Sequence, residues 1–116
     1  MKLHVLRNVT NGKVLASRVA RAGNPISRAL GLLPRDAVSP DEGLWIDGCA
    51  AVHTMGMRAT IDLYFLDAER RVVRIVEAVK PNRLAVACRS SEIVVELGVE
   101  PQTARSVSIG DQLALE

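Results

Sequence analysis

The spacing of hydrophobic and polar residues predicts a chain built mainly from short strands. Residues 2–8 alternate in character, and residues 13–19 follow them after Thr-Asn-Gly at positions 10–12. Because Asn-Gly tolerates positive φ in a tight turn, these two segments are expected to form a β-hairpin. Apolar patterning and turn residues predict further strands at residues 44–46, 61–66, 71–79, 84–87, 93–97 and 112–115.

Helical signals are few. Asn24 and Pro25 suit the N-cap and first position of a helix, and Gly31 suits the position after its end, so a helix of barely two turns is expected there. A second short helix is expected at residues 102–106. The connections are too short for helical crossovers, which favours antiparallel pairing. The predicted fold class is α+β, dominated by a mainly antiparallel sheet.

Length and composition limit the class of protein. With 116 residues, 48% of them apolar and 24% charged, the chain is expected to form one globular domain over residues 1–116. It has no apolar run of membrane-spanning length and no apolar N-terminal stretch typical of a signal peptide. We therefore expect a soluble cytoplasmic protein without membrane contact, as a monomer or weak homodimer, with both cysteines reduced.

The net charge of +2 hides an uneven distribution. Residues 1–35 hold seven basic and no acidic side chains, whereas residues 36–116 hold eight basic and thirteen acidic ones. This suggests an anion or nucleic-acid binder as one alternative. The basic residues alternate with apolar ones and no aromatic side chain lies among them, which favours packing against the acidic remainder of the domain. The binding alternative uses the basic residues of positions 18–35, namely Arg18, Arg21, Arg28 and Arg35.

Residues 43–67 concentrate the large, polarizable and titratable side chains. All three aromatic residues lie there, together with one of the two histidines and one of the two cysteines. Polar groups beside aromatic ones are typical of a ligand groove. The leading hypothesis is therefore a non-catalytic binding or accessory domain for a small molecule or peptide end. Its predicted groove comprises Trp45, His53, Met57, Arg58, Asp62 and Tyr64.

Structural roles compete with binding roles at these positions. His53 titrates near neutrality, yet an imidazole also bridges backbone groups of an irregular loop. Asp62 lies in an apolar strand and needs a partner, for which Arg58 or the loop backbone is expected. Met57 and Trp45 are residue types that more often fill a core.

Metal and thiol chemistry gives a second functional alternative. Cys49, His53 and Cys88 are zinc-binding residue types, and Met55 and Met57 carry thioethers that suit Cu(I). The paired Cys-x-x-Cys or His-x-x-x-His spacing is missing, so no metal, cofactor or catalytic residue is assigned. The enzyme alternative is a small hydrolase or metal-assisted enzyme that uses His53 with Asp62 or Cys49.

A series of motifs extends along most of the chain. It comprises residues 31–35 (Gly-Leu-Leu-Pro-Arg), 41–46 (Asp-Glu-Gly-Leu-Trp-Ile), 53–58 (His-Thr-Met-Gly-Met-Arg) and 61–67 (Ile-Asp-Leu-Tyr-Phe-Leu-Asp), then Cys88, residues 94–97 (Val-Val-Glu-Leu) and Gly110-Asp111. From about Arg18 onward the chain resembles the DUF 192 family, a bacterial and archaeal family of unknown function. The block from His53 to Asp67 is the most specific part.

The resemblance implies a compact β-rich fold, a curled sheet or barrel with one or two short helices. It implies no catalytic residue, cofactor or substrate. The sequence departs from the family pattern at Met55, where relatives usually show an aromatic residue, and at residues 98–101, which lack a Pro-Ala-Gly turn. Many relatives also begin with a secretion signal, and we expect none at the start of this sequence.

Overall fold

The computed structural model describes residues 2–22, 37–52, 54, 57–83 and 86–116. Within this part of the chain, strands dominate and the one helix is short. In chain order the elements are β1 (Leu3–Asn8), β2 (Val14–Ala22), β3 (Glu42–Asp47), β4 (Ala51–Val52), β5 (Ile61–Leu66), β6 (Val72–Val79), β7 (Val86–Ala87), β8 (Ile93–Gly98), α2 (Gln102–Arg105) and β9 (Leu113–Leu115).

Most predicted elements form close to their expected positions. The expected N-terminal hairpin is present as the antiparallel pair β1–β2, and each predicted later strand has a counterpart among β3 and β5 to β9. The helix expected near the end of the chain is α2. The expected helix at residues 24–31 lies outside the described residues.

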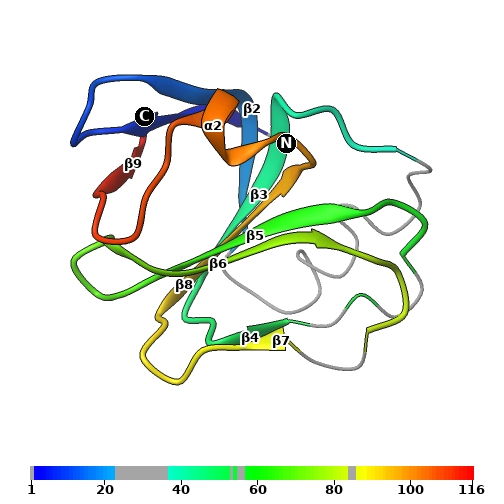
Figure 1. Cartoon of the computed structure of the whole chain (residues 1–116). Helices are drawn as coiled ribbons and strands as arrows, with labels where there is room; N and C mark the ends of the chain where they lie inside the picture. Colours follow the sequence, from blue (N-terminus) through cyan, green and yellow to red (C-terminus); the bar gives the residue numbers. More distant parts are fainter. Residues whose placement is uncertain (1, 23–36, 53, 55–56, 84–85) are drawn as a thin grey trace.

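Seven strands form one mixed sheet in the order β6-β5-β8-β3-β2-β1-β9, and β4 and β7 form a separate antiparallel pair (Figure 1). Neighbours in the large sheet are antiparallel except β2 and β3, which are parallel. The expectation that every connection is too short for a crossover was wrong at this point. Residues 23–41 between these two strands give the chain enough length to return and run in the same direction.

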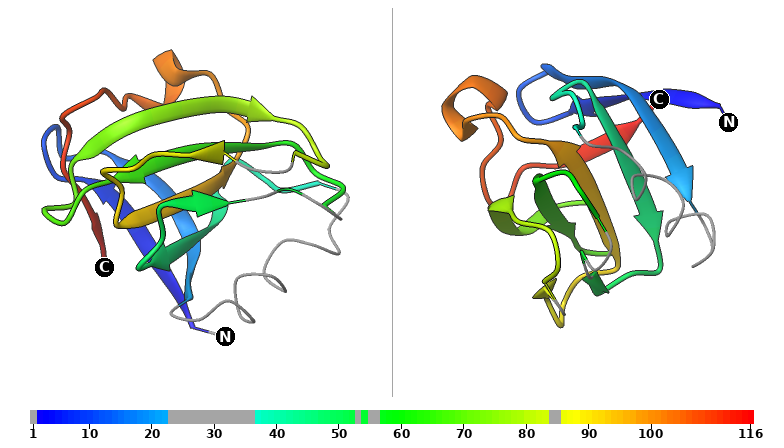
Figure 2. Two further views of the ribbon diagram at one scale, coloured as in Figure 1. Left: turned by 90° about the horizontal axis from the view of Figure 1, so that it is seen from below. Right: turned by 90° about the vertical axis from the view of Figure 1, so that its right-hand side faces the viewer.

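The large sheet curls until its two outer strands touch at one end. Arg71, just before β6, forms a bridge with Gln112, just before β9. The Val72 amide donates to the Asp111 carbonyl at 2.8 Å, and the Leu113 amide donates to the Arg70 carbonyl at 2.9 Å. Figure 2 shows from two further sides how the strands wrap around a common interior. The sheet is curled but not closed, so the barrel form of the expectation does not apply.

Two hydrophobic clusters lie on opposite faces of this sheet. One joins Leu6 of β1 and Leu113 of β9 to Trp45 and Tyr64, and it therefore unites strands from both ends of the sheet on the inside of the curl. The other cluster combines residues from the outer face of the sheet with residues of the segment from Cys49 to Ala59 and with Val86. Because both faces are covered, all six residues of β5 are buried.

Candidate functional site

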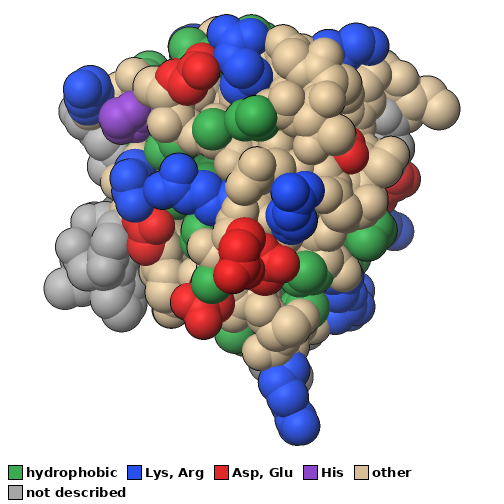
Figure 3. Space-filling model, turned by 90° about the vertical axis from the view of Figure 1, so that its left-hand side faces the viewer, with side chains coloured by type: hydrophobic (Ala, Val, Ile, Leu, Met, Phe, Trp, Pro, Cys, Tyr) green, Lys and Arg blue, Asp and Glu red, His purple; other side chains and the backbone are tan. Residues whose placement is uncertain are grey.

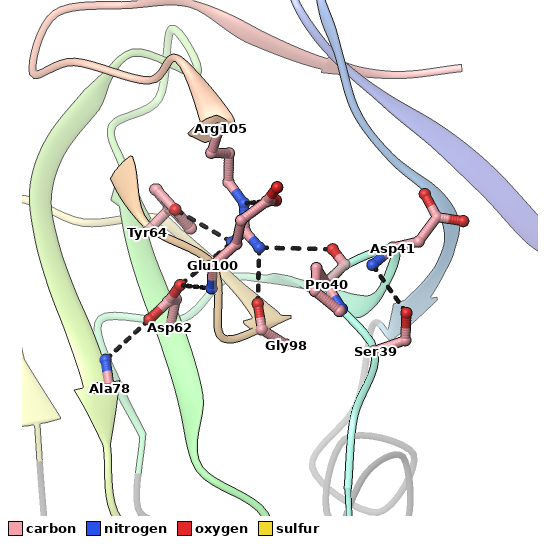
Figure 4. Close-up of polar contacts among 9 residues, drawn as sticks. All are labelled: Ser39, Pro40, Asp41, Asp62, Tyr64, Ala78, Gly98, Glu100 and Arg105. Atoms are coloured by element: carbon pink, nitrogen blue, oxygen red, sulfur yellow. Dashed lines mark hydrogen bonds and ion pairs between the residues drawn. The ribbon is translucent and has the colours of Figure 1, made fainter. Parts of the chain in front are cut away.

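Asp62 is buried inside the curl, and its carboxylate is fully bonded. One oxygen accepts a hydrogen bond from the Ala78 amide at 2.8 Å, and the other accepts one from the Glu100 amide at 3.0 Å. The second oxygen also lies 3.4 Å from Nη1 of Arg105, and neither side chain of this ion pair is exposed to solvent (Figure 4). Arg105 thus has the partner role that the sequence analysis expected of Arg58.

Arg105 ties together elements that are distant in sequence. Its guanidinium donates to the Tyr64 hydroxyl at 3.1 Å, to the Gly98 carbonyl at 2.7 Å and to a carboxylate oxygen of Glu100 at 3.3 Å. These bonds fix α2 against β5 and the end of β8. The sequence analysis missed Arg105, because 43 positions separate it from Asp62 and no local pattern marks a pairing at that distance.

Trp45 is also buried inside the curl, with 1% of its surface exposed. Its indole nitrogen donates to Asp47 at 3.1 Å, and Arg21 binds the same carboxylate at 2.6 and 3.1 Å. The hydrogen bond from Arg21 lowers the pKa of Asp47 below its ordinary value, against an opposing effect of burial. The Arg70 guanidinium lies 5.8 Å from the centroid of the indole ring.

The expected groove residues are therefore separated. Trp45, Asp62 and Tyr64 are buried on the inner face of the sheet. Met57 packs in the outer cluster, on the opposite face, and the Arg58 side chain is exposed. His53 lies outside the described residues. The five described members of the predicted groove thus include residues on opposite faces of the sheet.

Three described members of the basic N-terminal segment, Arg7, Arg18 and Arg21, have acidic partners within the chain. Arg18 lies 3.9 Å from Asp41 and 3.2 Å from Glu42, and Arg21 binds Asp47. These pairs match the interpretation that the basic segment packs against the acidic remainder. Arg28 and Arg35 lie outside the described residues. On the face shown in Figure 3, Lys and Arg side chains likewise lie beside Asp and Glu side chains.

The outer face of the sheet carries a second layer, which we call the loop layer. It comprises the β4–β7 pair and its flanking residues, that is residues 48–52, 54, 57–60, 80–83 and 86–91. Figure 1 shows the β4–β7 pair set apart from the strands of the main sheet. Thr54 and residues 57–60 of this layer belong to the block from His53 to Asp67, the most specific part of the motif series.

Thr54 holds the two halves of the loop layer together. Its side chain is fully buried, donates to the Lys80 carbonyl at 2.8 Å and accepts from the Arg83 amide at 2.8 Å. Its backbone amide donates to the Arg83 carbonyl at 3.0 Å. Its backbone carbonyl accepts from the Asn82 amide at 2.8 Å and from the Met57 amide at 3.1 Å. The sequence analysis did not single out Thr54, although it follows His53 in the specific block. Five hydrogen bonds at one residue fix the backbone on both sides of the loop layer.

The loop layer is basic. Residues 48–60 and 80–91 contain no Asp or Glu, and they contain Arg58, Lys80, Arg83 and Arg89. All four side chains are exposed. Among the described residues, Lys80, Arg83 and Arg89 form no ion pair. The layer thus differs from the strands of the sheet, where several basic groups are neutralised by acidic neighbours.

Neither a metal-binding cluster nor a membrane-spanning helix is found among the described residues. No three of their His, Cys, Asp and Glu side chains come together in the way a metal site requires. In the same part of the chain, no helix has the length and hydropathy needed to cross a bilayer.

Comparison with known proteins identifies relatives over almost the full length. The model of the DUF192 family, described as "Uncharacterized ACR", matches residues 6–115. A UPF0127 protein of Pyrococcus furiosus is 37% identical over 109 residues, which cover 91% of this chain and 93% of that protein.

Two solved structures share the fold. One, from Sinorhizobium meliloti and provisionally described as a transcription regulator, has a TM-score of 0.80 at 24% identity, and the match covers 97% of this chain and 91% of that one. The other is a protein of unknown function from Novosphingobium aromaticivorans, with a TM-score of 0.76 at 19% identity and coverage of 97% and 83%. At these identities the likeness concerns the fold alone.

Proposed function

The chain belongs to the DUF192 family, whose function is unknown, and from this premise we propose that it is a non-catalytic binding or accessory domain whose loop layer holds an anionic ligand. The observation that carries the proposal is the contrast in charge between the two layers. In the sheet, Arg18 and Arg21 bind acidic side chains. In the loop layer, Lys80, Arg83 and Arg89 are exposed, and residues 48–60 and 80–91 contain no Asp or Glu.

Two properties of the loop layer suit a binding face. Loops that project from a rigid scaffold often carry binding residues, and the bonds of Thr54 hold these loops in place. Exposed guanidinium groups recognise carboxylate and phosphate through paired hydrogen bonds. We therefore expect a small molecule that bears carboxylate or phosphate groups, or the carboxyl end of a peptide.

A single-stranded nucleic acid fits this layer less well. Such strands bind largely by stacking their bases on aromatic side chains. All three aromatic residues, Trp45, Tyr64 and Phe65, are at most 1% exposed, so none offers a stacking surface.

The proposal changes the roles of the groove residues. Asp62, Tyr64 and Trp45 become structural residues, because their polar atoms bond to other parts of the same chain. Arg58 stays within the proposed binding face. His53 keeps its sequence-based hypothesis of ligand contact, and the variant His53→Ala tests it separately.

Thermal unfolding with added anions tests the proposal. The probes are inorganic phosphate, citrate and ATP, each compared with sodium chloride at equal ionic strength. A ligand at ten times its Kd stabilises the folded state by about 1.4 kcal/mol. For a chain of this size we expect this to raise Tm by roughly 3–7 °C.

A charge-matched pair of variants locates the effect. The triple variant Lys80→Gln, Arg83→Gln, Arg89→Gln is expected to lose the rise in Tm. The control variant Lys2→Gln, Lys13→Gln, Arg18→Gln removes the same charge from the other layer and is expected to keep the rise. An equal loss in both variants would show a general charge effect, and the absence of any rise with wild type would reject the anionic ligand class tested.

A further inference from the structure

The two cysteines lie at the same end of the loop layer and contact the same cluster. Cys49 is 3% exposed and belongs to the outer hydrophobic cluster, and the partly buried Cys88 packs against that cluster. Neither takes part in a disulfide. The Cys49 thiol donates to the Ala51 carbonyl at 3.1 Å, and the Cys88 sulfur lies 3.5 Å from the Ser90 hydroxyl oxygen. Both side chains therefore approach the same apolar region beneath the β4–β7 pair.

The backbone brings the two residues close together. Ala51 pairs with Ala87 in the β4–β7 ladder, and the Cys88 amide donates to the Ala50 carbonyl at 2.9 Å, which continues that register by one residue. Cys49 is the next residue after Ala50 along this direction. In a regular ladder Cys49 would face Arg89 and point away from Cys88, but the chain bends at Ala50, and both cysteine side chains reach the same cluster. Neighbouring positions across a strand pair lie within the Cα separation that a disulfide spans.

Ser91 joins the two cysteines a second time. Its hydroxyl donates to the Cys49 carbonyl at 3.1 Å, and its amide donates to the Cys88 carbonyl at 3.0 Å. One serine thus bonds to both residues, and this contact is independent of the ladder. The backbone on both sides of the two cysteines is held by hydrogen bonds before any covalent bond forms between them.

We propose that Cys49 and Cys88 form a reversible disulfide across the end of the loop layer. The oxidant is a peroxide, and the reductant is a small thiol or dithiol. The two residues are unequal in a way that suits this reaction, because Cys88 is partly exposed whereas Cys49 is buried. Cys88 therefore meets the peroxide, and Cys49 resolves the product.

The reaction balances in two steps. The Cys88 sulfur attacks one peroxide oxygen, the O–O bond breaks, and Cys88 becomes a sulfenic acid as the first water forms. The Cys49 sulfur then attacks the Cys88 sulfur, the S–O bond breaks, and the leaving hydroxide takes the thiol proton as a second water. Two thiols lose two electrons in total, and hydrogen peroxide gains them.

Treatment of the full-length reduced protein with hydrogen peroxide tests this proposal. The expected result is loss of both titratable thiols, an intact mass lower by about 2 Da, and a peptide that links Cys49 to Cys88. Addition of dithiothreitol should restore both thiols. In the native reduced protein, a small alkylating reagent should label Cys88 before Cys49.

Two single variants separate the steps. In Cys49→Ser the sulfenic acid of Cys88 has no resolving thiol, so dimedone should trap it. In Cys88→Ser the buried Cys49 should react slowly and give no intramolecular product. Circular dichroism checks that each variant is folded. The proposal is wrong if wild type keeps both thiols at peroxide concentrations that trap Cys88 in Cys49→Ser. It is also wrong if the disulfide forms between two chains and not within one. Neither outcome depends on what the loop layer binds.

Discussion

At the scale of single residues, the buried contacts of Asp62 give it a structural role. Its carboxylate satisfies two backbone amides and faces the buried guanidinium of Arg105. Removal of one charge from a buried pair leaves the other uncompensated, which costs about 3–5 kcal/mol. We therefore expect Asp62→Asn to lower the free energy of unfolding by that amount, as measured by urea denaturation.

The variant Glu116→Gln is the matched control for this prediction. Glu116 forms an ion pair with Arg7 at 3.0 Å, and both side chains are more than a third exposed. Water screens such a pair, so the same change from carboxylate to amide should cost less than about 1 kcal/mol there. Equal costs at the two sites would show that the Asp62–Arg105 pair is not the structural tie described above.

At the scale of elements, the irregularity near the end of β6 depends on Asp62. The pairing of β5 with β6 shifts between Ile61 and Leu63, and opposite this shift Ala78 has a φ of 50°. The Ala78 amide points to the Asp62 carboxylate at 2.8 Å, so the buried carboxylate stabilises a backbone conformation that alanine disfavours.

The variant Ala78→Gly tests this account. Glycine adopts positive φ without a steric penalty, so we expect the free energy of unfolding to stay unchanged or rise by up to about 1 kcal/mol. The control Ala16→Gly lies in β2 at a fully buried position, where loss of the methyl group and greater chain entropy should cost about 1–2 kcal/mol. Chemical denaturation of both variants measures the difference, and an equal loss at both positions would contradict the strain at Ala78.

The strands were accessible from sequence because their signals are local. Alternation and an Asn-Gly turn predict the β1–β2 hairpin, and a run of apolar residues interrupted only by Asp62 predicts β5. The bonds that organise the site are not local. Thr54 contacts the Lys80–Arg83 turn, and Asp62 contacts Arg105, across 26 and 43 positions of the chain. No spacing along the chain encodes these contacts, so the partners expected for Asp62 were nearby ones, Arg58 or the loop backbone.

At the scale of the whole molecule, the alternating pattern predicts which residues share a face of the sheet. It does not predict whether that face is open to solvent or buried. Trp45 and Tyr64 were expected in one groove, and both lie in the inner cluster. The curl of the sheet then buries them, because β1 and β9 return over that face. Pattern arguments treat a sheet as flat, so they cannot distinguish the wall of an open groove from the interior of a curled sheet.

We expect the curl to depend on side-chain packing in addition to the backbone bonds across the seam. The two outer strands share the Arg71–Gln112 bridge and the hydrogen bonds beside it, and Leu113 of β9 is 1% exposed and packs in the inner cluster with Tyr64 and Leu66 of β5. Loss of a buried leucine costs about 2–5 kcal/mol, depending on how far the surroundings collapse. We therefore expect Leu113→Ala to lower the free energy of unfolding by that amount.

This variant should also loosen the seam between the outer strands. The amides of Val72 and Gly110 bond across it at 2.8 Å, and they should exchange with deuterium faster in Leu113→Ala than in wild type. The control Leu3→Ala removes the same atoms from a side chain that is 52% exposed, so its stability and exchange rates should stay close to wild type. Leu113→Ala could instead lose stability while the two seam amides keep their protection from deuterium exchange relative to the amides of β5. In that case backbone bonds hold the curl, and the packing account is wrong.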